Sequence, residues 1–228
     1  MLDGLTTAHL ADGCLRAGVT PRCAALRPVI AGRRVQGKAL PVQHFGSVDI
    51  FLEALEHASP GSILVIDNSA RLDEACAGDL VSLEAQQAGI GALVIWGAHR
   101  DTEEIRQIGM PVFSLGAMPV GPRRLDARTP DALEKANVAG FVVSADDYVV
   151  ADDDGVLFMP HARLDEIVAE AAQVRDTERA QAAEAKKGRS LRDQFHFAEY
   201  LEKRKSDPNL TLRKHLEEKK AAIEVRFS

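Results

Sequence analysis

Residues 62–67, SILVID, begin the part of the sequence that decides the fold. The run is short, apolar and rich in β-branched side chains, which is typical of a strand with both faces buried. Segments 92–96 (ALVIW) and 112–115 (VFSL) have the same character, and we expect helices over 78–87 and 102–107 between them. This alternation of strands and helices predicts parallel βαβ units and an α/β fold, with a loop from residue 67 to the first of these helices.

The flanking sequence extends this unit in both directions. On the N-terminal side we expect a helix from Thr6 or Thr7 to about Ala17, and strands joined by turns across 27–45. An amphipathic run after Ser47 then predicts a helix that ends at Pro60. On the C-terminal side, residues 141–159 alternate short apolar runs with polar turns, which predicts short strands. We therefore assign residues 1–160 to one α/β domain.

Residues 161–228 are expected to form a helical C-terminal extension. Segment 162–187 is rich in Ala, Glu, Gln, Lys and Arg, which are strong helix formers. Ser190 and Asp193 have the spacing of a capping box that opens a second helix, and a last helix follows from about Thr211. The second helix places four apolar residues on one face: Leu191, Phe195, Ala198 and Leu201. Because its apolar stripes are narrow, the extension should pack on the domain or on a neighbouring subunit.

The composition excludes several broad classes of protein. The 228 residues are 46% hydrophobic and 27% charged, as in folded globular proteins. A net charge of −6 does not favour nucleic-acid binding, which requires a basic face. No apolar stretch approaches the length of a membrane span, and the N-terminal residues do not resemble a signal peptide. The three cysteines do not form a disulfide framework, so we expect a cytoplasmic protein with no nucleic-acid or membrane partner.

Two turns that follow predicted parallel strands carry the residues best suited to chemistry. The carboxyl ends of parallel strands meet at one edge of the sheet, so both turns should lie there. Ligands of α/β proteins bind at that edge. The first is 77–80, where the backbone amides of Gly78, Asp79, Leu80 and Val81 would form an anion site at a helix N-terminus. The second is 97–101, which brings Arg100 and Asp101 to the same edge. An anion site, a guanidinium and two carboxylates suit an anionic substrate with a hard divalent cation.

Simpler interpretations of these residues stay open on spacing alone. Arg100-Asp101 is also the pattern of a surface ion pair or a helix cap, and Gly78-Asp79 is a common helix start. The acidic run 152–154 lacks the pattern of a calcium loop and is better interpreted as a β-turn closed by Gly155. Cys76 has no histidine partner in the sequence that would indicate a nucleophile.

The chain resembles a known family in these same residues. Asp79, twenty further residues and then Arg100-Asp101 is similar to the D-x20-R-D signature of the 4-hydroxy-4-methyl-2-oxoglutarate aldolases. These enzymes share their fold with the RraA regulators of ribonuclease E. Segments 60–67, 97–104, 111–113 and 151–156 also resemble family motifs, and the similarity covers roughly residues 5–160. The resemblance implies an RraA-like αββα sandwich with parallel βαβ units.

The resemblance also implies a division of labour at the site. Asp101 would hold Mg²⁺ or Mn²⁺, and the 2-oxo acid would bind that metal and the amides of residues 78–81. Arg100 would stabilise the developing enolate, and Asp79 would orient or deprotonate a water that takes the substrate hydroxyl proton. A glutamate from the neighbouring subunit would complete the site; Glu178 fits best, with Glu170 or Glu184 as alternatives.

These roles predict a metal-dependent class II pyruvate aldolase, assembled as a homotrimer or homohexamer, that also decarboxylates oxaloacetate. One alternative is a regulator without catalysis that binds a ribonuclease or an RNA helicase, although regulators of that type typically lack the acid at the position of Asp79. Another is a lyase for a different 2-oxo or hydroxy acid. His99, expected near the metal, and the loop 118–137 depart from the family pattern, and both could set the substrate.

Overall fold

The structure is a computed structural model that describes residue 2 and residues 4–219. Two compact units divide the chain: Pro21–Leu164, and residues 1–20 together with 165–228. The first helix therefore groups with the C-terminal helices. The predicted domain division between residues 160 and 161 stays a prediction.

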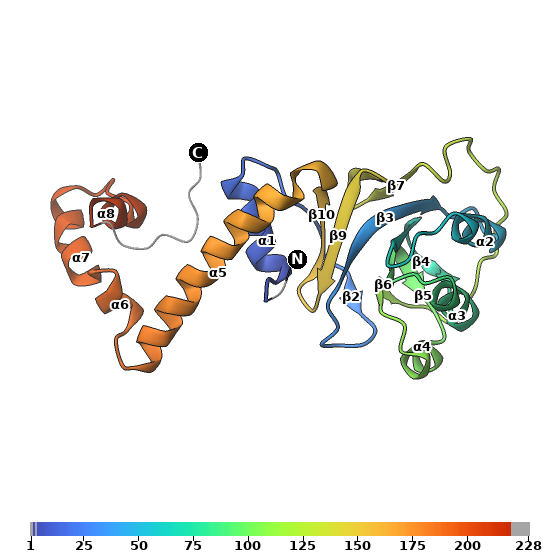
Figure 1. The fold of residues 1–228 in the computed structure, drawn as a ribbon, viewed down its shortest axis with the longest axis horizontal. Coiled ribbons are helices and arrows are strands. Elements are labelled where there is room, and N and C mark those ends of the chain that lie inside the picture. Colours follow the sequence, from blue (N-terminus) through green and yellow to red (C-terminus); the bar gives the residue numbers. More distant parts are fainter. Residues whose placement is uncertain (1, 3, 220–228) are drawn as a thin grey trace. The chain divides into compact units, whose positions relative to one another are not determined.

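The unit Pro21–Leu164 is built on an eight-stranded mixed sheet in the order β1-β10-β9-β3-β4-β5-β6-β2 (Figure 1). Strands β3 to β6 are mutually parallel neighbours, which confirms the predicted α/β fold with parallel βαβ units. The strands are β1 (Arg22–Ala24), β2 (Arg27–Pro28), β3 (Val35–Gln43), β4 (Ile63–Ala77), β5 (Ala92–His99), β6 (Val112–Ala117), β9 (Asp147–Asp152) and β10 (Gly155–Pro160). A separate hairpin pairs β7 (Lys135–Val138) with β8 (Phe141–Ser144).

The parallel strands are covered on both faces, as their apolar sequences require. Helices α2 (Asp49–Glu56), α3 (Asp79–Gln87) and α4 (Thr102–Ile108) contribute Phe51, Ala85 and Ile105 to the core on one face. On the other face, residues of β7 to β10 pack against Ile63 and Val65. The unit thus has a helical layer and two β layers.

Strand β4 is longer than the sequence predicted, and the expected loop after residue 67 is wrong. β4 continues to Ala77 through register shifts against β5 between residues 67 and 77. Ser69 and Ala70 lie within this arch with φ angles of 54° and 56°, a region that non-glycine residues rarely occupy. The bulged backbone arches away and returns to pair Ala77 with His99, so both strands end next to the predicted site.

The other unit contains α1 (Thr7–Arg16), α5 (Leu164–Lys186), α6 (Leu191–Gln194), α7 (Phe197–Ser206) and α8 (Leu212–Glu218). The predicted capping box of Ser190 and Asp193 is confirmed at the start of α6. The single helix expected after Ser190 is instead two helices, because His196 has a left-handed φ of 50° between them. No helix within the described residues is long and apolar enough to cross a bilayer.

Helix α1 packs closely on α5 at Gly13. A Cβ at this position would lie 2.6 Å from the carbonyl oxygen of Ile167 and 2.9 Å from Cβ of Ala171. The Arg16–Glu170 ion pair at 2.8 Å and the His9–Glu178 hydrogen bond at 2.9 Å flank the contact. The glycine therefore sets the distance between the two helices.

We expect Gly13→Ala to destabilise the protein by about 1–3 kcal/mol, although alanine is the better helix former. The added methyl group would push α1 away from the backbone of α5. Urea unfolding followed by circular dichroism measures the effect. A midpoint equal to or above that of the wild type would contradict the packing described for Gly13.

Candidate active site at the carboxyl edge of the parallel strands

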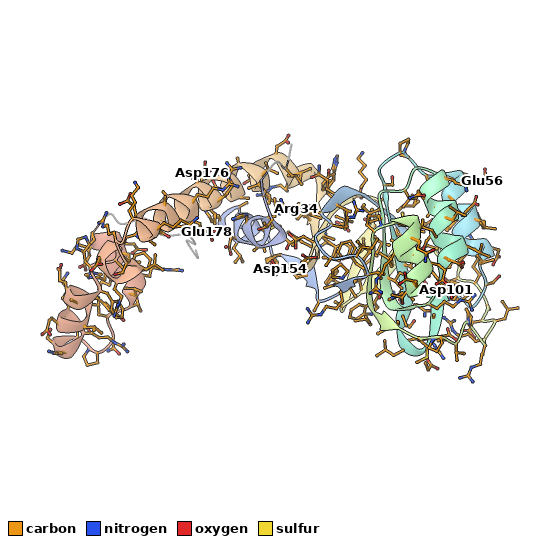
Figure 2. All side chains as sticks on the ribbon, turned by 90° about the horizontal axis from the view of Figure 1, so that it is seen from below. Arg34, Glu56, Asp101, Asp154, Asp176 and Glu178 are labelled. Carbon is orange, nitrogen blue, oxygen red and sulfur yellow. The ribbon has the colours of Figure 1, made fainter. Side chains whose placement is uncertain are left out.

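The structure brings the two predicted turns together. Gly78 is the N-cap of α3, directly after β4, and Asp101 is the N-cap of α4, shortly after β5. The N–H of Arg100 donates a hydrogen bond of 3.0 Å to the carbonyl of Ala77, which joins the turns through their backbones. Figure 2 labels Asp101 at this edge of the sheet. The predicted juxtaposition of Gly78, Asp79, Arg100 and Asp101 is therefore present.

Gly78 is required by the close approach of the second turn. A Cβ on this residue would lie 2.2 Å from Oδ2 of Asp101 and 3.0 Å from Cγ of Arg100. These distances are far inside van der Waals contact. Any side chain at position 78 would displace the carboxylate, so the glycine admits Asp101 to the N-terminus of α3.

Asp101 is held in a strained conformation. Its φ and ψ angles are 56° and 46°, the left-handed region in which Asp is tolerated better than most residues. Its Oδ2 accepts a 3.4 Å hydrogen bond from the N–H of Asp79 and lies 3.3 Å from Nε of Arg100. Strain of this kind clusters at functional sites, and here it places the carboxylate between an amide and a guanidinium.

The first turn of α3 already attracts negative groups. The N–H of Leu80 donates a 2.7 Å hydrogen bond to Oδ1 of its neighbour Asp79, and the N–H of Asp79 faces Asp101. Carboxylate oxygens thus lie on two of the amides assigned to the anion site. The Leu80 side chain is 75% exposed and Val81 is half-buried; both side chains are apolar, so the polar groups that these residues offer are their backbone amides. A substrate carboxylate would have to replace the side chain of Asp79 at the Leu80 amide.

The donor set fits an open metal site with one protein carboxylate. Within the described residues, no group of three or more His, Cys, Asp or Glu side chains could enclose an ion. The side chain of Asp101 is 33% exposed, and its described contacts involve Oδ2. Mg²⁺ commonly binds through one or two carboxylates, with water and substrate oxygens as its other ligands. Asp101 suits that mode.

His99, the nearest imidazole in the sequence, is buried within the fold. Its Nδ1 lies 2.7 Å from Oγ of Ser114, and its Nε2 lies 3.0 Å from Oγ1 of Thr102. Burial lowers the pKa of the imidazole below its usual value. Both ring nitrogens are occupied, so the residue fixes the end of β5 and the start of α4.

Two other sequence-based candidates have structural roles. Burial raises the pKa of the Cys76 thiol to about 12, which leaves it protonated and unreactive. Asp152 accepts a hydrogen bond from the N–H of Asp154 in the turn between β9 and β10. The interpretation of 152–154 as a β-turn is therefore confirmed.

Glu178, the glutamate expected to reach a neighbouring subunit, lies on α5 in the other unit (Figure 2). Its Oε2 accepts a 2.9 Å hydrogen bond from Nε2 of His9. The backbone N–H of Thr6 donates to Nδ1 of the same ring, which assigns the proton to Nε2. Glu170 is paired with Arg16, and Glu184 with Lys187. The contribution of Glu178 to another subunit stays a prediction.

Sequence reasoning missed a buried polar cluster beside the site. It consists of His44, Asn68, Glu74 and Arg124. Glu74 is only 2% exposed and is paired with Arg124, which comes from the segment that the sequence marked as an atypical loop. The sequence feature that could have indicated this cluster is a glutamate directly before the apolar run 75–77.

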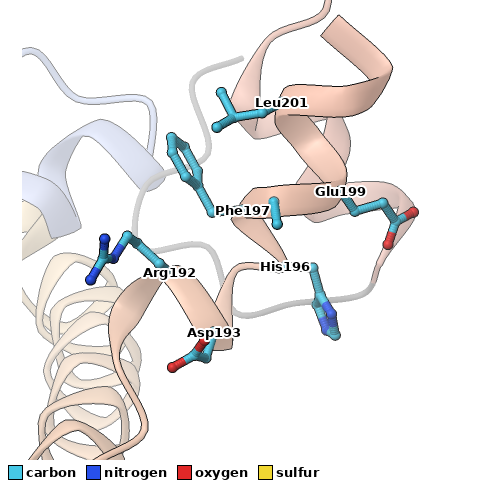
Figure 3. Close-up of a pocket in the computed structure, with 7 residues that line it drawn as sticks. Arg192, Asp193, His196, Phe197, Glu199 and Leu201 are labelled. Carbon is cyan, nitrogen blue, oxygen red and sulfur yellow. The ribbon is translucent and has the colours of Figure 1, made fainter.

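The C-terminal helices α6 and α7 line a hollow. Its lining comes from α6, α7 and His196 between them, and includes Arg192, Phe197 and Leu201 (Figure 3). None of the predicted site residues lines it. The concave surface of α6 and α7 is therefore separate in sequence and composition from the candidate active site.

Comparison with known proteins places the chain in a family. The RraA-like family (Aldolase/RraA) matches residues 7–158. A Burkholderia multivorans protein named "Putative 4-hydroxy-4-methyl-2-oxoglutarate aldolase" is 32% identical over 157 residues, which cover 67% of this chain and 92% of that protein. Protein DlpA of Legionella pneumophila is 29% identical over 78% of this chain, but the match spans only 30% of the DlpA sequence.

A solved structure agrees with this placement. Streptomyces coelicolor RraAS2, described as an unusual member of the RNase ES inhibitor RraA protein family, superimposes with a TM-score of 0.68 at 25% identity. The match covers 78% of this chain and 91% of RraAS2. The family match, the relatives and the shared fold agree, and the chain belongs to the RraA-like (Aldolase/RraA) family.

Proposed function

We propose that this chain is a divalent-metal-dependent class II pyruvate aldolase. It cleaves 2-oxo acids of the 4-hydroxy-4-methyl-2-oxoglutarate type and also decarboxylates oxaloacetate. The observation that carries the proposal is the convergence of the Arg100 guanidinium, the Asp101 carboxylate and the N-terminal amides of α3. The names of relatives such as the Burkholderia multivorans protein support a lyase.

Each residue has a role that follows from its position. The amides of residues 78–81 bind the substrate carboxylate, which replaces the side chain of Asp79 at Leu80. Asp79, once released, orients or deprotonates a water that takes the proton of the C4 hydroxyl. The C3–C4 bond then breaks, and its electron pair forms the enolate of pyruvate, whose oxygen Arg100 stabilises. Protonation at C3 completes the first pyruvate, and C4 becomes the carbonyl of the second.

Asp101 is the residue that would hold Mg²⁺ or Mn²⁺, which supplies Lewis-acid stabilisation of the same enolate charge when bound. Oxaloacetate loses carbon dioxide from C4 to give the same enolate, so its decarboxylation needs Arg100 but no base for a hydroxyl proton. We further propose a homotrimer or homohexamer in which Glu178 of one subunit reaches the site of the next.

The decisive assay measures pyruvate release from 4-hydroxy-4-methyl-2-oxoglutarate and from oxaloacetate, first with Mg²⁺ and then after EDTA treatment. We expect turnover of both substrates with Mg²⁺, loss with EDTA, and recovery when excess Mg²⁺ is added back. Circular dichroism before and after EDTA controls for unfolding. A folded protein without metal-dependent turnover of either substrate would eliminate the proposal.

The second candidate is a regulator that binds a ribonuclease or an RNA helicase. It is favoured by the similarity to RraAS2, whose description names an RNase ES inhibitor family. Asp79, which forms part of the candidate site here, is the residue that argues for catalysis. A folded but inactive protein would make this second candidate the better one. Turnover of another 2-oxo or hydroxy acid alone would instead indicate a lyase with a different substrate.

A further inference from the structure

The segment between β6 and β7 crosses the edge of the sheet that carries the candidate site. We call residues 118–132 the strap. The N–H of Gln43 fixes the end of its main chain through the carbonyl of Ala132. Three further bonds lie nearer the site: the N–H of Met118 donates to His99, the N–H of Ala75 donates to Val120, and the N–H of Asp126 donates to Phe45. These bonds are 2.8, 2.7 and 2.9 Å long. The strap is therefore attached to β5, to β4 and to the residues after β3.

Arg124 is the side-chain anchor of the strap. Its Nε donates a 2.8 Å hydrogen bond to Oε1 of Glu74, and its Nη2 donates to Oδ1 of Asn68 at 2.9 Å and to the carbonyl of His44 at 3.0 Å. Asn68 and Glu74 are both buried in β4. A planar guanidinium with several fixed donors can join these acceptors at once, which a single ammonium cannot.

The strap touches Arg100 three residues before this anchor. A Cβ on Gly121 would lie 2.7 Å from Nη1 of Arg100, so the glycine backbone packs directly on the guanidinium. On its other side, Nε of Arg100 lies 3.3 Å from Asp101. The Arg100 side chain is 45% exposed, so these two contacts restrict a guanidinium that otherwise has access to solvent.

We propose that Arg124 is a positioning residue that acts through Arg100. By joining the strap to Glu74 and Asn68, it holds Gly121 against the guanidinium and fixes the direction in which Arg100 faces the substrate. This inference rests on the proposed function, because that function gives Arg100 the role of stabilising the enolate oxygen. It explains why a long segment without regular structure is fixed by a buried ion pair.

The kinetic test compares Arg124→Met and Arg124→Lys with Gly121→Ala, which disturbs the contact and leaves the anchor intact. The matched control is Arg128→Met, because Arg128 lies on the same strap but pairs with the exposed Glu53. We expect Arg124→Met and Gly121→Ala to lower kcat by about 10- to 100-fold with KM within about threefold, since an Arg100 that is displaced loses contacts in the transition state. Arg124→Lys should recover part of kcat, and Arg128→Met should behave as the wild type.

A double-mutant cycle separates positioning from general damage. Arg124→Met should lower kcat by less than about twofold when Arg100 is already alanine, because its effect passes through that side chain. An equal loss in both backgrounds would overturn the proposal. Wild-type kcat in Arg124→Met would also overturn it.

A measurement without substrate keeps the inference separate from the proposed function. Hydrogen–deuterium exchange of peptides covering 118–132 should be faster in Arg124→Met than in the wild type and unchanged in Arg128→Met. Exchange equal to the wild type in Arg124→Met would refute the anchoring. Faster exchange in a protein without lyase activity would support the anchoring and reject only the proposed function.

Discussion

Arg100→Ala is expected to lower kcat for aldol cleavage and for oxaloacetate decarboxylation together, each by about a hundredfold or more. Both reactions develop negative charge on the same enolate oxygen, and Arg100 is the guanidinium that the two βα turns and Gly121 hold at the site. Steady-state kinetics with both substrates at saturating Mg²⁺ measures the effect. Because the contact is used mainly in the transition state, kcat should fall much more than KM rises.

The matched control for this prediction is Arg106→Ala. Arg106 lies on α4 and is also largely exposed. Its Nη1 lies 3.8 Å from Glu103, and its Nε donates a 3.3 Å hydrogen bond to the carbonyl of Val29. Its removal should leave kcat for both substrates within about twofold, as for an ordinary surface ion pair. If Arg100→Ala were as active as Arg106→Ala, the assignment of Arg100 to the enolate would be wrong.

Asp79→Asn is expected to separate the two reactions. Asparagine keeps an oxygen that can accept the hydrogen bond from the N–H of Leu80, so the start of α3 should be preserved. The amide cannot act as a base, and aldol cleavage should fall by about 10²- to 10⁴-fold. Oxaloacetate has no hydroxyl proton to remove, so its decarboxylation should stay within about tenfold of the wild type.

Asp79→Ala, which removes both the base and the acceptor for the N–H of Leu80, should show the same separation with lower thermal stability. Pyruvate release from each substrate and thermal unfolding of each variant check these expectations. Equal losses in cleavage and decarboxylation for Asp79→Asn would argue against Asp79 as the group that activates water.

The local sequence pattern was sufficient for the centre of the fold. Apolar runs at 62–67, 92–96 and 112–115 predict parallel buried strands, and parallel strands necessarily bring their following turns to one edge. This geometric rule correctly predicted that Gly78 and Asp101, which come from successive βα turns, lie close together in space. The roles of these residues came from the family resemblance, since a helix cap and a binding site look alike in spacing.

What the sequence missed depends on long-range contacts. The continuation of β4 beyond residue 67 results from its pairing with β5, which overrides the polar composition of the arch at 68–74. The break at His196 requires a left-handed residue that local propensity does not reveal. The pairing of Glu74 with Arg124 joins residues separated by 50 positions, and no local pattern predicts it.

The contact between Gly78 and Asp101 has a consequence for how such proteins diverge. The two positions share one small volume, so a larger residue at 78 is compatible with the fold only if the carboxylate at 101 is shortened or turned away. Positions 78 and 101 should therefore change together during evolution. In a relative with a side chain at position 78, a carboxylate at position 101 can no longer lie at the N-terminus of α3, even if all other site residues are the same. The pair can serve as a criterion for sorting relatives that retain this chemistry from those that have turned the same scaffold to another use.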